Sequence, residues 1–222
     1  MNKFAIAACV LALALSGCGS LPGGMGALGG GGSSSKVNAD ELNKRGTKLV
    51  LKVGAASMLA SAAQIKLLEA AGAEVEAKKL SEVLTDAQAA KDDPEKAKML
   101  TKASNEASAL LSQIDFSAQL DSAKAKEAVS LGILNFGGAL LMDASALKDA
   151  GELSKEISAG GASAALSLKS ALQAANFIKD EVPGQVKMLG QASESLTAYA
   201  KTNRIELPSK EAIQKIANLD RK

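Results

Sequence analysis

The stretch Ala128–Met142, which reads AVSLGILNFGGALLM, decides the fold of this chain, because only Ser130 and Asn135 in it are polar. Its apolar residues recur at helical spacing on more than one side of the same helix. A helix that is apolar all round has to be buried on all sides. We therefore expect this segment to be the central helix of the fold, with the other helices packed around it.

Insertion into a membrane is the competing explanation for the same stretch. Its 15 residues, with a rise of about 1.5 Å each, span about 22 Å. The hydrocarbon core of a bilayer is about 30 Å thick. The stretch is therefore short for a membrane span, and burial in the core of a helical domain is the better interpretation.

Helix signals are also present on the N-terminal side of this stretch. Asn38 stands three residues before Glu41, a capping-box pattern that predicts a helix start. Apolar or small residues then recur at spacings of four and three, which predicts one helix that runs past Gly72 to about Ala90 and bends at the glycine. The pair Asp93-Pro94 predicts the next helix start, with the aspartate as N-cap and the proline at the first helical position.

The C-terminal half shows the same kind of signals. The central stretch belongs to a long helix predicted from Ser117 to about Ala159, where Gly160-Gly161 ends it. Because Pro183 separates two apolar stripes, two helices are predicted there, and a short helix closes the chain. The stripes run over Leu168–Val182 and Val186–Ala200, and the closing helix carries Ile213 and Ile216.

Strand signals are nearly missing, because β-branched and aromatic residues do not alternate over any useful length. The sequence therefore predicts an all-α fold: an antiparallel bundle of about five long helices plus a short C-terminal helix. The seams of these helices consist mainly of alanine, serine and glycine, with leucine at intervals. Such small side chains let helix backbones approach closely.

The N-terminus has the three parts of an export signal: a basic residue, Lys3, a short apolar run, Phe4–Leu15, and a cysteine motif. The motif Leu15-Ser16-Gly17-Cys18 resembles the lipobox of bacterial lipoproteins, and this resemblance covers residues 1–18 alone. It implies that residues 1–17 are a signal peptide, that cleavage precedes Cys18, and that acyl chains on Cys18 anchor the chain to a membrane. It also implies the cell envelope as location. Since Gly19 and not aspartate follows the cysteine, the outer membrane facing the periplasm is implied for a Gram-negative cell.

The segment Gly19–Ser35 is uncharged and glycine-rich, which predicts a flexible tether after the lipidated cysteine. A glycine-serine coil of this length has an average reach of roughly 20–25 Å. The segment contains a G-x-G-x-x-G pattern, Gly24–Gly29, but this pattern indicates nucleotide binding only between a strand and a helix. The predicted organisation is a signal peptide (1–17), an anchor and tether (18–35) and one helical domain (36–222).

Several chemistries are disfavoured by composition. The chain has no histidine, and of its two cysteines Cys9 would leave with the signal peptide and Cys18 would carry lipid. A Ser-His-Asp triad, a thiol nucleophile and the usual zinc ligands are therefore missing from the expected mature chain. The net charge of +2 argues against a nucleic-acid partner. We predict no catalytic residue, no cofactor and no metal ligand.

Two patterns resemble functional sites but have simpler explanations. Ser145–Lys148 fits the S-x-x-K pattern of penicillin-binding proteins and β-lactamases, but the companion motifs of those families are missing. Ser33–Lys36 matches equally well inside the predicted tether. Paired carboxylates, at Glu74 and Glu76 and in Asp92-Asp93, lack the spacing and glycine of a calcium loop and are expected to be solvated charge.

Three functions are compatible with these features. The leading hypothesis is a membrane-tethered, non-enzymatic envelope protein whose helical domain contacts another envelope component. The second is a carrier of an apolar ligand such as a lipid, held between helices, with space beside Phe136 at Gly132, Gly137 and Gly138. The same glycines are better explained as points of close helix contact. The third is membrane remodelling by an emerging Ala128–Met142 hairpin.

Overall fold

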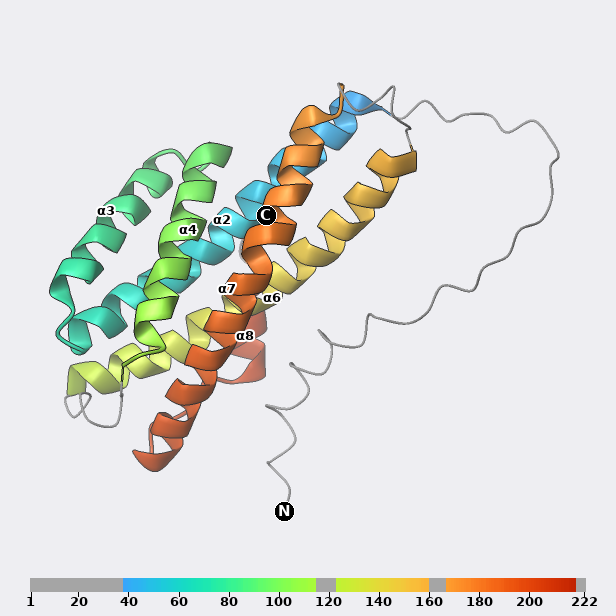
Figure 1. Cartoon of the computed structure of the whole chain (residues 1–222). Helices are drawn as coiled ribbons and strands as arrows, with labels where there is room; N and C mark the ends of the chain where they lie inside the picture. The colour runs from blue at the N-terminus through green and yellow to red at the C-terminus, as the bar shows by residue number, and fades with distance from the viewer. Residues whose placement is uncertain (1–37, 115–122, 160–166, 219–222) are drawn as a thin grey trace, which may run out of the picture. The chain divides into compact units, whose positions relative to one another are not determined.

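The computed structural model of the chain describes residues 38–114, 123–159 and 167–218. Within these ranges there are six helices and no strand (Figure 1). The predicted all-α class is confirmed, with five long helices and a short C-terminal one. The helices are α2 (Ala39–Ala70), α3 (Glu74–Ala89), α4 (Pro94–Leu111), α6 (Ala123–Ala159), α7 (Lys169–Thr202) and α8 (Lys210–Ala217).

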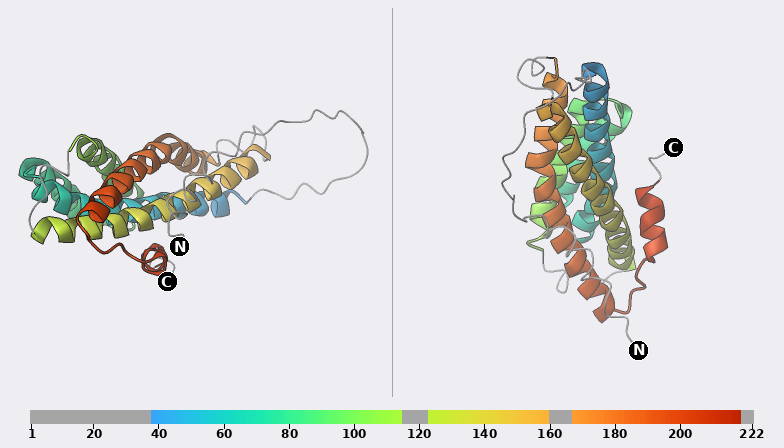
Figure 2. Two further views of the ribbon diagram at one scale, coloured as in Figure 1. Left: turned by 90° about the horizontal axis from the view of Figure 1, so that it is seen from below. Right: turned by 90° about the vertical axis from the view of Figure 1, so that its right-hand side faces the viewer.

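The three longest helices, α2, α6 and α7, pack on one another, and α6 runs antiparallel to the other two (Figure 1). The α3–α4 hairpin covers one side of α2, and α4 also contacts α7. On the opposite side α8 lies against α6, as both views in Figure 2 show. All described helices belong to one compact unit, Val37–Lys222. We therefore expect this unit to fold without the residues that precede it.

The central helix is α2, not the helix that contains Ala128–Met142. Helix α2 packs against α3, α4, α6 and α7, whereas α6 packs against α2, α7 and α8. Small residues allow α2 this position: a Cβ added at Gly54 would lie 2.6 Å from the Cβ of Ala97 on α4, and one at Gly46 would lie 2.9 Å from the Cα of Ala171 on α7. In α6 the apolar side is left partly open, with Leu141 39% exposed.

Polar side chains fix α4 against α2. Gln64 is fully buried and donates from Nε2 to the backbone oxygen of Ser104 (3.0 Å) and to Oγ of Ser108 (2.7 Å). The Oγ atoms of Ser57 and Thr101 lie 2.9 Å apart in a hydrogen bond. Because buried polar groups are costly without partners, these bonds hold α4 in one register along α2.

The predicted helix over residues 38–90 is wrong at Gly72, because two helices occupy this range. Gly72 has a φ of +79°, the left-handed conformation that glycine adopts without strain. The N–H of Ala73 donates to the oxygen of Leu68 (2.8 Å) and that of Gly72 to the oxygen of Glu69 (3.2 Å). These two bonds form a Schellman motif, which satisfies the last carbonyl groups of α2 and reverses the chain into α3.

The predicted break at Pro183 is also wrong, because α7 continues through it from Lys169 to Thr202. Proline removes the hydrogen bond to the carbonyl of Lys179, but Pro183 and Lys179 are exposed, so water can satisfy that carbonyl. The buried side chains on either side, Val182 and Gln185, keep both halves of α7 on the bundle.

Other helix ends agree with the sequence. Asn38 caps α2 by accepting from the N–H of Glu41 (3.3 Å), and Asp93 caps α4 by accepting from the N–H of Glu95 (2.9 Å). Helix α6 is described as far as Ala159, so its predicted end there is not tested. Its predicted start at Ser117 and the pair Gly160-Gly161 lie outside the described residues.

Candidate functional site

A groove with an apolar floor lies between α2, α6 and α8. We call it the α2–α6 groove, and its volume is about 1140 Å³. The end of α3 and the turn between α3 and α4 also line the groove, through Gln88, Lys91 and Asp92. The apolar floor consists of Leu51, Ala55, Met58, Leu59 and Ala62 from α2 and Leu141 and Met142 from α6, with Ala217 at the α8 side.

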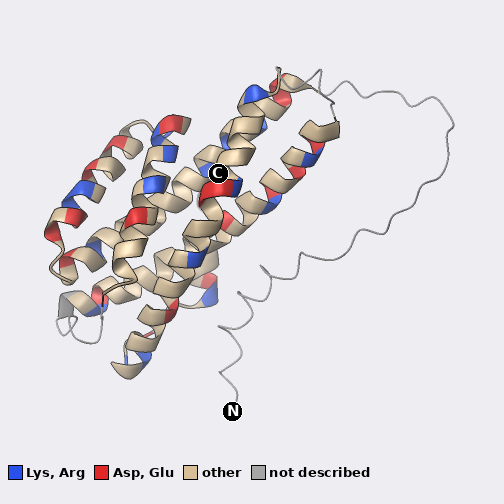
Figure 3. Cartoon of the chain, in the orientation of Figure 1, with Lys and Arg blue, Asp and Glu red and all other residues tan. Residues whose placement is uncertain are grey.

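The rim of the groove is polar and carries more lysine than acid. Lys48 and Lys52 come from α2, and Lys91 and Asp92 come from the α3–α4 turn. Elsewhere the charges of both signs are interspersed along the helices (Figure 3), in keeping with the net charge of +2. The groove therefore combines an apolar floor with a locally positive edge.

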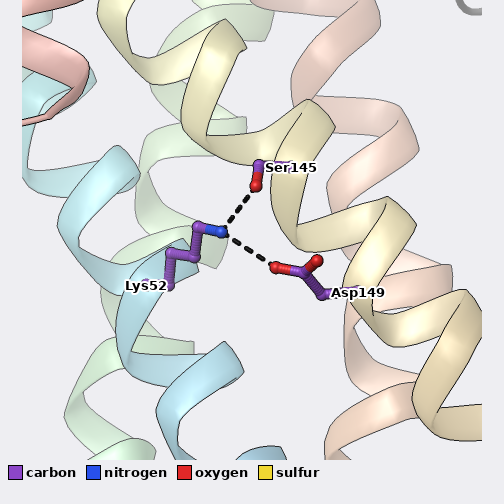
Figure 4. A network of polar contacts seen from close by, with 3 residues as sticks. All are labelled: Lys52, Ser145 and Asp149. Atoms are coloured by element: carbon purple, nitrogen blue, oxygen red, sulfur yellow. Dashed lines mark hydrogen bonds and ion pairs between the residues drawn. The ribbon is translucent and has the colours of Figure 1, made fainter. Parts of the chain in front are cut away.

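Lys52 links the two helices that form the floor (Figure 4). Its Nζ donates to Oγ of Ser145 (2.7 Å) and to Oδ2 of Asp149 (3.0 Å), both on α6. Ser145 belongs to the S-x-x-K pattern, but its partner is Lys52 from another helix, while Lys148 is exposed. A serine nucleophile needs a base that accepts its proton, whereas Lys52 donates to Ser145 and is held by Asp149. The arrangement therefore suits a brace between α2 and α6.

Helix α8 occupies the surface next to the groove through two glycine notches on α6. A Cβ added at Gly137 would lie 2.9 Å from Cγ2 of Ile213, and one at Gly138 would lie 2.9 Å from Cγ2 of Ile216. At the opposite face, a Cβ at Gly132 would lie 2.7 Å from Cδ1 of Leu196. These three glycines are therefore sites of close helix contact, and side chains of the protein fill the space beside them.

A buried carboxyl group, Asp143, lies where two apolar clusters of the bundle meet. On α6 the residues Met142 and Ala146 on either side belong to different clusters. Asp143 is fully buried, and neither of its carboxylate oxygens has a hydrogen-bond partner in the described part of the chain. Burial raises the pKa of Asp143 well above its ordinary value of 3.8, because it penalises the charged form.

Asp143 was missed in the sequence because it follows the apolar stretch directly and resembles the start of a polar segment. A helical signal was present: Asp143 is seven residues after Phe136, which places both on one helix face. Phe136 is fully buried. The groove was missed for another reason, since its residues come from four segments far apart in the chain.

The paired carboxylates have the positions expected of solvated charge. Glu74 is exposed and Glu76 half-exposed in the first turn of α3, and Asp92 is exposed before α4. Negative charge at a helix start is favourable. Within residues 38–114, 123–159 and 167–218 no group of three or more Cys, Asp or Glu side chains is placed to hold a metal ion. Cys18 lies outside these ranges, so its lipidation stays a prediction.

Two helical segments, Ala39–Ala70 and Ala125–Ala159, are long and apolar enough to cross a membrane by length and composition. In their most apolar windows 61% and 56% of the residues are buried inside the bundle. Core helices of bundles have the same properties, so this is weak evidence for membrane insertion. Compared with known proteins, the chain matches no protein-family model, no curated protein and no solved structure.

Proposed function

We propose that this chain is a membrane-tethered, non-enzymatic envelope lipoprotein whose helical domain is an interaction module. The observation that carries the proposal is the α2–α6 groove, whose apolar floor is left without a covering element in the described part of the chain. Apolar surface that is contiguous and rimmed by polar residues is typical of sites of protein–protein interaction. The lipobox resemblance and the glycine-rich segment after it support a tether that gives the domain reach without a set orientation.

The described side chains also favour an interaction module over catalysis. The Ser145–Lys52 pair is held by Asp149 in a brace, and the chain has no histidine. Carriage of a lipid inside the bundle has less support, because side chains fill the notches at the three glycines of α6 that would have made room for it.

The proposal is tested by cross-linking in intact cells that produce the protein. The full-length chain is cross-linked, purified under denaturing conditions and analysed by mass spectrometry. We expect one reproducible envelope protein attached to the helical domain, and the intact mass should show acyl chains on Cys18. The matched control is a Cys18→Ser chain, which should lose both the lipid and the partner. If the wild-type chain captures no reproducible envelope partner, an interaction module is the wrong function.

A further inference from the structure

Helix α8 shows that the exposed side of α6, next to the groove, accepts a helix. Ile213 and Ile216, three residues apart, place their methyl groups over Gly137 and Gly138. No residue of α8 is fully buried, so these two half-buried side chains provide much of its attachment. This is the helix-in-groove mode, in which apolar residues at spacings of three and four enter pockets in a helical surface.

The α2–α6 groove lies beside α8 on the same side of α6. One turn after the notches, α6 presents Leu141, which is 39% exposed. Helix α2 contributes Ala55 and Met58 opposite it, both partly exposed. The end of α8, at Ala217, forms one limit of this open part. The apolar surface therefore extends beyond the part that α8 covers.

The lysines at the rim indicate the charge of the missing occupant. Lys52 is held by Ser145 and Asp149. Lys48 and Lys91 form no ion pair with another residue of the described ranges. Asp92, on the same rim, also forms no ion pair within the described ranges, so the unpaired rim charges are two cations and one anion. This positive balance beside an apolar floor complements an apolar stripe that is flanked mainly by carboxylates.

We propose that the α2–α6 groove docks an amphipathic helix of a partner protein, whose apolar stripe covers Leu141 and whose acidic flank faces Lys48 and Lys91. This inference rests on the proposed function and specifies its surface and its kind of partner. A helix fits better than a single acyl chain, because the groove has a volume of about 1140 Å³ and a single narrow chain would leave much of the floor in water.

The proposal is tested by measuring the binding of two fluorescein-labelled model helices to the domain Val37–Lys222. Both carry isoleucine at spacings of three and four, as α8 does, and they differ only in glutamate or lysine at the flanking positions. Fluorescence anisotropy measures binding. We expect saturable binding of the glutamate helix that is about tenfold tighter than that of the lysine helix. The double variant Lys48→Glu with Lys91→Glu should reverse this preference.

A matched pair of substitutions locates the binding site. Leu141→Glu should weaken binding of the glutamate helix by at least about tenfold. Leu172→Glu, at a leucine of α7 that is 40% exposed and outside the groove, should leave it unchanged. Both positions are on the surface, and circular dichroism checks that both variants keep the parent helix content.

Several outcomes would overturn the proposal. These are equal binding of the two helices, no binding of the glutamate helix up to about 1 mM, or equal loss in both leucine variants. Binding of a fluorescent fatty acid that depends on Leu141, without binding of the glutamate helix, would assign the groove to a lipid instead. If Leu141→Glu chains still cross-link to their envelope partner in cells, the interaction module stands and this groove is not its site.

Discussion

Replacement of Asp143 by asparagine is predicted to remove a pH dependence from the stability of the domain. Asp143 is buried without a hydrogen-bond partner in the described ranges. Burial therefore raises its pKa well above 3.8, since an ionised carboxyl group would lose its hydration without compensation. Between the ordinary and the raised pKa the folded domain keeps the proton, and the unfolded chain releases it.

The sign and size of the effect follow from this difference in bound protons. Because the unfolded chain binds fewer protons, the free energy of unfolding falls by about 1.4 kcal/mol for each unit that the pH rises in this window. The contribution of Asp143 is complete below its unfolded value of 3.8, and it is lost as the pH rises towards the folded pKa. Asparagine has no proton to release, so the stability of Asp143→Asn relative to the parent should grow with pH.

This difference is measured by urea unfolding of the parent domain and of Asp143→Asn, at several pH values between about 4.5 and 7.5. The contributions of other titrating groups cancel when the two free energies of unfolding are subtracted. The control is Asp180→Asn, the same substitution at an exposed aspartate of α7 outside the core. A difference for Asp143→Asn that is constant with pH, or that shrinks as the pH rises, would show that this carboxyl group is hydrated or paired.

Three further predictions concern packing, a turn and the anchor. Gly151→Ala should raise the free energy of unfolding by about 0.5–1 kcal/mol, because nothing lies within 4 Å of the added Cβ. Gly54→Ala should lower the free energy of unfolding by about 1–3 kcal/mol, because its Cβ would come within 2.6 Å of that of Ala97. If chemical denaturation gave the same change for Gly54→Ala as for Gly151→Ala, the close contact of α2 with α4 would be contradicted. Arg204 has a φ of +55° at the end of α7, so Arg204→Gly should stabilise the domain by up to about 1 kcal/mol, and a lower Tm would refute this. Cys18→Ser should abolish incorporation of labelled palmitate and release the protein from the membrane fraction; a variant that keeps the label would disprove the anchor.

Local chemistry made several helix ends predictable. The caps at Asn38 and Asp93 depend on residues within about one turn, so the neighbouring residues in the sequence were sufficient to find them. The helical class was equally accessible, because apolar spacing is a property of each segment alone.

Gly72 and Pro183 show where local rules failed. Both residues disfavour a helix interior, yet glycine ended a helix that was expected to bend, and proline lies inside a helix that was expected to end. Gly72 and Pro183 differ in their surroundings in the fold. Gly72 closes a Schellman motif and lets the α3–α4 hairpin fold back on α2. Pro183 lies on an exposed face of a helix whose opposite face is buried along its whole length.

The amino-acid pattern alone was enough for the helical class, for the places where capping residues start a helix and for the expectation of a lipid anchor, because each depends on neighbours in the chain. Tertiary packing decided that α2 and not α6 is central, that Asp143 is buried without a partner, and that α8 leaves a groove beside Leu141. These features join residues that are far apart in sequence. They depend on which small residues let two backbones meet, and hydrophobic spacing within one helix carries no information about that choice.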